Sequence, residues 1–207
     1  MADWVRLFFS EVKATGSWQW LAVIFGVAEV FLAKANSKLL YPAGILATII
    51  SFFLLIDVKL FAEAFLNLYY LVMSIYGWAY WAQSKNQPSV NITYANRSEW
   101  FITIAISLGG WLMLYLILKN FTTSDVPVLD AFVSATAWAG MWLLTRRKID
   151  NWILLNISNL VAIPLLFHKK LAMFSVLTLV LFVVAIFGYF QWRRIYRKRL
   201  YVYPVEV

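Results

Sequence analysis

Seven stretches of mostly apolar residues follow one another along this chain, and each is about as long as a bilayer crossing. A helix needs roughly 20 such residues to span the hydrocarbon core. Of the 207 residues, 63% are hydrophobic and 14% are charged, and a soluble protein of this size cannot bury so much apolar surface. The sequence therefore predicts an all-α integral membrane protein. Its spans are expected at Trp18–Ala33, Leu39–Ile56, Phe61–Gln83, Trp100–Leu118, Ala131–Thr145, Asn151–Phe167 and Leu171–Trp192.

The reactive and charged side chains exclude several classes of function. The chain has no Cys and a single His, so we expect no disulfide framework, no metal site and no catalytic triad. No nucleotide-binding or other cofactor motif is present in the sequence, and we expect no cofactor. The 18 Lys and Arg outnumber the 10 Asp and Glu. In so apolar a chain this excess indicates loops beside anionic lipid rather than a nucleic-acid surface.

The distribution of the basic residues predicts the orientation of the chain in the membrane. Twelve of the 18 Lys and Arg fall on one side of the predicted spans and six on the other. The richer side is expected to be cytoplasmic, which places the N-terminus outside and the C-terminus inside.

The predicted spans also divide the chain into segments. We expect an amphipathic N-terminal segment at 1–17, a first three-helix unit at 18–83, a linker with the fourth helix at 84–128, a second three-helix unit at 129–192 and a basic cytoplasmic tail at 193–207.

An internal repeat links the two three-helix units. SIYGWAYW at Ser74–Trp81 and AIFGYFQW at Ala185–Trp192 share Ile, aromatic, Gly, aromatic and Trp in the same order and spacing. We call the shift that carries Ser74 onto Ala185 the repeat offset, and under it the first three spans overlay the last three. A unit of three spans ends on the opposite side of the membrane from its start. A second copy of the unit can therefore have the same orientation in the membrane only if an additional span lies between the two copies. The sequence predicts a 3+1+3 parallel-repeat arrangement, which is a transporter architecture; chance matching of apolar helices is the competing interpretation.

Two spans carry polar side chains at helical spacing. In the third span the shared face holds Asn67, Tyr70, Ser74, Trp78 and Trp81. In the sixth span it holds Trp152, Asn156 and Asn159. Indoles stack on flat rings and attract cationic ones, and amides bond hydroxyls or a carboxamide. Because neither face carries a carboxylate, we predict a cavity for a small, flat, hydroxylated molecule that is neutral or cationic.

Structural interpretations compete with this binding site. The Asn side chains can join helices by interhelical hydrogen bonds, and Trp81 can belong to the aromatic belt at the membrane interface. Glu29 is an intramembrane acid and therefore a candidate for transport or gating, unless Lys34 draws it toward the interface. We expect Gly77, Gly188 and Pro164 to act as flex points, with the sixth span bent or locally unwound near the proline.

With these residues the chain resembles the PnuC family of bacterial vitamin transporters. NLYYLVMSIYGWAYW at Asn67–Trp81 is similar to the family's Asn-rich aromatic stretch that ends in Trp-x-x-Trp. TRRKIDNWILLNISNLVAIPLLFHKKL at Thr145–Leu171 is similar to its basic loop followed by Asn-Trp and two further Asn. The resemblance extends from about Trp18 to Trp192. One departure is Leu155, which stands where the family often has a second Trp, so that one stacking contact is missing.

The resemblance implies a SWEET-like fold and uptake of a nucleoside-like vitamin across the bacterial inner membrane. It implies facilitated diffusion, trapping of the vitamin by cytoplasmic phosphorylation, and a homotrimer. The family's best-known substrate is nicotinamide riboside, a planar cationic ring with a carboxamide on a ribose. That molecule fits the predicted Trp and Asn cavity, with rocking of the two halves alternating access to it.

Other functions remain open from the sequence. Thiamine, also a planar cation, and riboflavin are alternative substrates within the family. A membrane enzyme needs a nucleophile and a base within reach of each other, whereas this chain offers one intramembrane acid and one His at a loop. A purely structural helical bundle predicts no saturable ligand.

Overall fold

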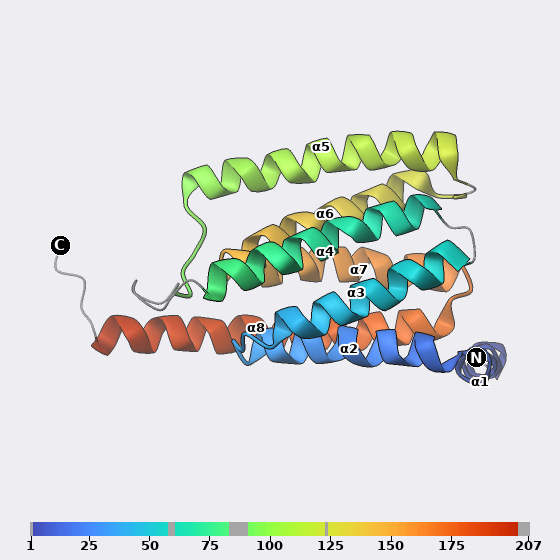
Figure 1. Ribbon diagram of the computed structural model, residues 1–207, viewed down its shortest axis with the longest axis horizontal. Helices are drawn as coiled ribbons and strands as arrows, with labels where there is room; N and C mark the ends of the chain where they lie inside the picture. The colour runs from blue at the N-terminus through green and yellow to red at the C-terminus, as the bar shows by residue number, and fades with distance from the viewer. Residues whose placement is uncertain (1, 58–60, 83–90, 123, 203–207) are drawn as a thin grey trace.

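The computed structural model describes residues 2–57, 61–82, 91–122 and 124–202 (Figure 1). These residues are mostly helical, and their one β-type pairing is an isolated bridge between Thr93 and Lys148. The helices are α1 (Ala2–Ala14), α2 (Ser17–Lys34), α3 (Leu40–Asp57), α4 (Phe61–Ala82), α5 (Arg97–Phe121), α6 (Pro127–Thr145), α7 (Asn151–His168) and α8 (Ala172–Val202). Predictions that fall on residues 1, 58–60, 83–90, 123 and 203–207 lie outside the described residues.

Six of these helices are long and apolar enough to cross a membrane, namely α2, α3, α5, α6, α7 and α8. The exception, α4, coincides with the third predicted span but is not among these six. It nevertheless packs within the bundle, against α3 and α6 (Figure 1). The all-helical class is confirmed, while the criterion of length and hydropathy supports six of the seven predicted spans.

Two helices differ from their predicted form. α8 continues to Val202, well beyond the predicted end of the last span at Trp192, because the basic segment that follows holds neither Pro nor Gly to stop it. α7 stays helical through Pro164. Of the two predicted alternatives, local unwinding is therefore wrong: the helix continues past the proline, although the ring removes one backbone donor. A bend at Pro164 stays a prediction.

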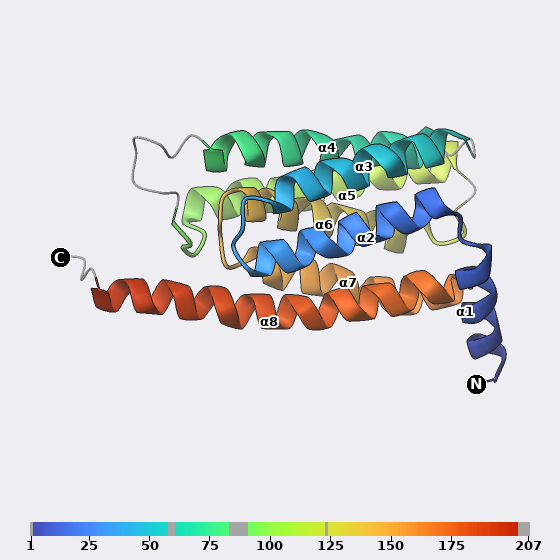
Figure 2. The ribbon, with the colours of Figure 1, turned by 60° about the horizontal axis from the view of Figure 1, so that its bottom comes forward.

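The N-terminal helix lies across the start of α8 (Figure 2). The Glu11 carboxylate accepts hydrogen bonds from the backbone N–H groups of Ala172, at 3.1 Å, and Met173, at 2.7 Å. These N–H groups have no partner inside their own helix, and a carboxylate there also meets the positive end of the helix dipole. The Trp4 ring packs edge-on against Phe167, with centroids 5.5 Å apart. These contacts fix α1 against the ends of α7 and α8.

Six of the remaining seven helices pack in two similar sets of three (Figure 2). α3 contacts both α2 and α4, and α7 contacts both α6 and α8. Two contacts join the sets, α2 with α8 and α4 with α6, so that the first helix of each set meets the third helix of the other. α5 lies outside the two sets and packs mainly on α6. The core between the sets is formed at the end that carries the α2–α3 and α6–α7 turns, here called the turn end.

The two turns have the same backbone geometry at positions that the repeat offset relates. Asn36 and Arg147 both have a φ of 54°, the left-handed conformation that ends many helices. The Asn36 N–H donates to the Ala33 carbonyl at 2.9 Å, and the Arg147 N–H donates to the Leu144 carbonyl at 2.9 Å. The N–H of the following residue in each turn donates to the carbonyl that precedes this acceptor, from Ser37 to Leu32 and from Lys148 to Leu143, also at 2.9 Å. Local structure thus recurs at the offset found in the sequence.

Candidate functional site

Four buried aromatic rings meet at the turn end, and we call them the aromatic cluster: Tyr41, Trp81, Trp152 and Trp192. Tyr41 meets Trp81 edge-on with centroids 5.1 Å apart, and Trp152 meets Trp192 edge-on at 5.6 Å. The repeat offset relates the two pairs. Trp81 and Trp192 join them, with centroids 6.5 Å apart. The predicted site residues Trp81 and Trp152 are therefore brought into one cluster, although they come from different sets of helices.

The two predicted flex glycines are the positions where rings of this cluster meet a helix backbone. A Cβ placed at Gly77 would lie 2.6 Å from Cζ of Tyr41, and a Cβ at Gly188 would lie 2.8 Å from Cε2 of Trp152. Both distances are shorter than van der Waals contact, so only glycine admits each ring. Gly77 and Gly188 thus have a packing function in this structure, and their role as flex points stays a prediction.

The other predicted residues of α4 occupy different environments. Asn67 donates a 2.9 Å hydrogen bond from Nδ2 to the Thr48 carbonyl of α3, which joins two helices. Tyr70 is half-buried and packs against the core. Ser74 is 1% exposed. Trp78 is 45% exposed, so the structure does not bring it together with the buried indoles.

The predicted residues of α7 continue inward from Trp152. Asn156 and Asn159 follow at helical spacing, and both are half-buried. Trp152 and Asn156 also border a groove of about 350 Å³ between α7 and α8. That volume is in the range of ligand pockets, but most of its walls are apolar and several, such as Ile157 and Phe190, are exposed. The groove therefore suits an acyl chain, and the polar groups buried beside it are the better candidates for recognition.

Several buried polar atoms around the aromatic cluster make no hydrogen bond within the described residues. They are Tyr41 Oη, Ser74 Oγ, Trp142 Nε1, Trp152 Nε1 and Asn156 Oδ1. Leaving such a group unbonded in an apolar interior costs about 1–3 kcal/mol. A ligand with hydroxyl, amide or carbonyl groups can satisfy them. Three predicted site residues, Ser74 on α4 and Trp152 and Asn156 on α7, are among these donors and acceptors.

Glu29 lies on α2 against the start of α3. A Cβ at Gly44 would lie 2.6 Å from Oε1 of Glu29, so the carboxylate fills the space that this glycine leaves. It is within electrostatic range of the phenol groups of Tyr41 and Tyr70. The Lys34 ammonium instead lies 5.3 Å from the ring centroid of Phe187. The interpretation in which Lys34 pairs with the acid is therefore not supported.

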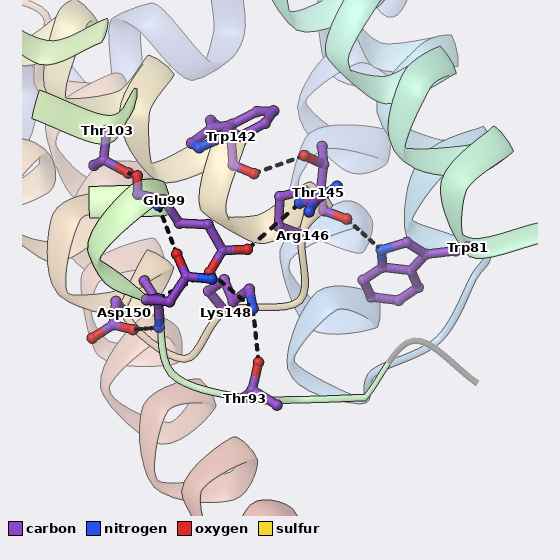
Figure 3. Close-up of polar contacts among 11 residues, drawn as sticks. Trp81, Thr93, Glu99, Thr103, Trp142, Thr145, Arg146, Lys148 and Asp150 are labelled. Carbon is purple, nitrogen blue, oxygen red and sulfur yellow. Dashed lines mark hydrogen bonds and ion pairs between the residues drawn. The ribbon is translucent and has the colours of Figure 1, made fainter. Parts of the chain in front are cut away.

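A polar network at the turn end was missed as a functional feature by sequence reasoning (Figure 3). The Glu99 carboxylate lies 3.0 Å from Lys148 Nζ and 3.7 Å from Arg146 Nε. The segment before α5 is tied to the α6–α7 turn by hydrogen bonds between the backbones of Thr93 and Arg147, at 3.2 Å, and from Lys148 Nζ to Thr93 Oγ1, at 2.9 Å. The basic run Arg146–Lys148 thus organises this end of the bundle.

Arg147 also covers one member of the aromatic cluster. Its guanidinium carbon lies 3.7 Å from the ring centroid of Trp81, close enough for a strong cation–π contact. Burial lowers the pKa of the Arg147 guanidinium from its usual value, although a guanidinium keeps its proton in proteins. The adjacent Arg146 packs over Tyr80 and Trp142 in the same manner, at 4.8 Å and 5.7 Å.

No group of three or more His, Asp or Glu side chains that could hold a metal ion is found among the described residues. The acids of these residues lie mostly apart from one another. Glu99 pairs with Lys148, and Asp130 lies 2.6 Å from Lys169 at the opposite end. The indole, phenol, amide and hydroxyl groups at the turn end are groups that can stack on an organic ring and hydrogen-bond its polar atoms.

The chain is similar to known proteins along most of its length. Residues 16–194 match the model of a family described as nicotinamide mononucleotide transporter. Nicotinamide riboside transporters PnuC of Escherichia coli (strain K12) and Shigella flexneri are each 20% identical to it, over 92% of this chain and 88% of their own. The crystal structure of the vitamin B3 transporter PnuC has the same fold, with a TM-score of 0.65 and 19% identity over 86% of this chain and 81% of that one. From these matches and the apolar helices, the chain belongs to the nicotinamide mononucleotide transporter family of multi-pass membrane proteins, the family of PnuC.

Proposed function

We propose that this protein carries nicotinamide riboside across the membrane. The observation that carries the proposal is the set of unbonded polar atoms beside buried indoles, above all Asn156 Oδ1 and Trp152 Nε1 on α7 and Ser74 Oγ on α4. The relatives named nicotinamide riboside transporter support the choice of substrate.

The chemistry of the substrate matches these groups one by one. Its flat cationic ring can stack on Trp81 or Trp152, which contributes about 0.5–2 kcal/mol for each indole face. Its carboxamide and ribose hydroxyls can bond amides and hydroxyls of the site. The full proposed set is Asn67, Tyr70, Ser74, Trp78, Trp81, Trp152, Asn156 and Asn159. Within it, the exposed Trp78 contributes only if α4 turns during transport.

We propose the 3+1+3 arrangement as the architecture that forms this site. α2–α4 would be one unit and α6–α8 its copy, with α5 between them as the inverting helix. The repeated turn geometry at Asn36 and Arg147 and the repeated ring-on-glycine contacts support the duplication. A site between two such units is the arrangement that alternating access requires, since rocking of one unit against the other exposes it to each side in turn.

We further propose that transport is facilitated diffusion in the bacterial inner membrane, with phosphorylation of the vitamin in the cytoplasm maintaining uptake. The turn end would be cytoplasmic, because it carries Arg146–Lys148 and the basic end of α8, which leaves the N-terminus outside. Gly77, Gly188, Pro164 and Glu29 are the proposed flexing or gating positions. The homotrimer remains a proposal that rests on the family resemblance.

Thermal unfolding of the detergent-solubilised protein tests the substrate. A ligand that binds only the native state raises its stability by mass action. We expect nicotinamide riboside to raise Tm in a concentration-dependent manner, and the Trp152→Ala variant to reduce that shift. Thiamine and riboflavin serve as competing ligands. A Tm that rises with thiamine and not with nicotinamide riboside would replace the proposed substrate, and no shift with any vitamin would favour a structural bundle.

A further inference from the structure

Glu29 is a carboxylate inside a membrane-spanning helix that makes no hydrogen bond or ion pair with any described residue of the chain. The other acids near the helix ends are engaged: Glu11 bonds the start of α8, Glu99 pairs with Lys148, and Asp130 pairs with Lys169. An ionised carboxylate in an apolar environment is costly unless an opposite charge or several donors meet it. Its position in α2, without a partner among the described residues, leaves it available to a group that comes from outside the chain.

The position of Glu29 places it at the aromatic cluster. Its carboxylate fills the space above Gly44 on α3, one turn from Tyr41. It lies within electrostatic range of Tyr41, whose hydroxyl is one of the unbonded polar atoms, and of Tyr70. Ser74, another of the predicted binding residues, is one turn beyond Tyr70 on the same face of α4. The acid thus faces the same region as the proposed binding groups.

The second set of helices lacks this charge. The repeat offset carries Glu29 onto Gly140 and Gly44 onto Leu155. Both pairs place a glycine against a larger side chain, but the glycine has changed helix. In the second set the glycine is on the first helix, where a Cβ at Gly140 would lie 2.9 Å from the Leu155 side chain of the second helix. Where α2 presents a carboxylate to a glycine, α7 presents an aliphatic group to a glycine. The site therefore has a carboxyl group on one side and an aliphatic side chain at the equivalent place on the other.

We propose that Glu29 is the counter-charge for a cationic substrate ring and makes the transporter prefer a cation to a neutral molecule of the same shape. This inference rests on the proposed function. The negative side of the site holds the charged ring by Coulomb attraction, while the indoles hold its faces and the amides its carboxamide and ribose. A neutral ring gains the stacking and the hydrogen bonds but not the charge interaction.

The test compares two ligands that differ in charge alone. Nicotinamide riboside carries a pyridinium ring, and benzamide riboside has a neutral ring of the same outline with the same carboxamide and ribose. Their affinities are measured by calorimetry on the purified wild type and on Glu29→Gln, which keeps the size of the side chain. We expect Glu29→Gln to weaken nicotinamide riboside at least tenfold while changing benzamide riboside less than twofold.

Two further variants control for folding and for net charge. Glu29→Asp keeps the carboxylate, and we expect it to retain the preference for the cation. Asp57→Asn removes a charge from the exposed end of α3 and should leave both affinities unchanged. Equal weakening of both ligands in Glu29→Gln, or no weakening of either, would overturn the role of Glu29 while leaving the proposed function in place. A wild type that binds neither ligand would overturn both.

Discussion

The indole N–H of Trp192 donates a 3.0 Å hydrogen bond to the carbonyl oxygen of Ala33 in the last turn of α2. Trp81, the repeat counterpart of Trp192, makes a similar bond, at 2.9 Å, to the carbonyl of Thr145 at the end of α6, one residue after the counterpart of Ala33. The third helix of each set thus bonds the end of the first helix of the other. These two bonds, with the aromatic contact between the indoles, hold the sets together at the turn end. Any motion that separates the two sets at this end must break both bonds.

Removing either indole N–H should loosen this junction. Trp192→Phe and Trp81→Phe keep an aromatic ring but lose the donor, and a hydrogen bond of this kind contributes about 0.5–1.5 kcal/mol. We expect each variant to unfold at a lower temperature in detergent. Trp18→Phe is the matched control, because Trp18 is 65% exposed and should give an unchanged Tm. Unchanged unfolding of both core variants would show that the two bonds do not contribute to stability.

Substitution of the ring-accepting glycines should impair the aromatic cluster. An added methyl group at Gly77 or Gly188 must displace Tyr41 or Trp152, and overpacking of a core costs about 1–3 kcal/mol. We expect Gly77→Ala and Gly188→Ala to lower both Tm and the affinity for nicotinamide riboside. Gly26→Ala is the control, since no atom lies within 4 Å of a Cβ built there, and alanine favours a helix over glycine by up to about 1 kcal/mol. A Gly188→Ala variant with full affinity would mean that Trp152 can move without loss of binding.

The Glu99–Lys148 pair should be the strongest ion pair of the turn end. Glu99 also completes a capping box with Asn96, in which each side chain bonds the backbone N–H of the other. A double-mutant cycle of Glu99→Gln and Lys148→Met should give a coupling of about 1–3 kcal/mol, as for charged groups that are largely shielded from water. The exposed Asp125–His168 pair, at 3.1 Å, should give less than about 1 kcal/mol. Equal coupling in the two cycles would contradict the structural role given to Glu99.

Much of the fold is predictable from the sequence because the bilayer imposes it. A single segment satisfies its own backbone in hydrocarbon only as a helix, so lengths of apolar sequence locate α2 through α7 and the start of α8 within a few residues. The end of α8 was not predictable from hydropathy, because its last residues form helix outside the apolar segment, where composition gives no signal for a stop. The sequence also could not decide between the two alternatives at Pro164, since a proline is compatible with a bend in a continuous helix or with local unwinding.

The candidate site was partly predictable from the sequence. Helical spacing shows which residues share one face of a helix, but it does not show which other helices that face contacts. Spacing placed Ser74 and Trp81 on one face of α4, and both are buried. Trp78 shares that spacing but is largely exposed, because a helix face is wide and its edge lies outside the packing contact. Sequence analysis did not identify Tyr41 as a member of the site. The repeat offset aligns Tyr41 with Trp152, but the two residues differ in type, so their equivalence becomes visible only from their contacts in the structure.

Asn67 and Asn156 should separate a structural amide from a binding amide. Asn67 Nδ2 donates to the Thr48 carbonyl, so Asn67→Ala is expected to lower Tm without ligand by breaking a bond between α4 and α3. Asn156 Oδ1 has no such partner among the described residues, so Asn156→Ala should leave that Tm nearly unchanged and weaken nicotinamide riboside. Loss of one hydrogen bond that a buried group makes to a ligand costs about 1–3 kcal/mol, or roughly five- to 150-fold in affinity. Asn120→Ala, whose amide bonds only its own helix at Leu116, should change neither quantity. If Asn156→Ala lowered Tm and kept full affinity, Asn156 would be a structural amide and the binding site would have to lie elsewhere.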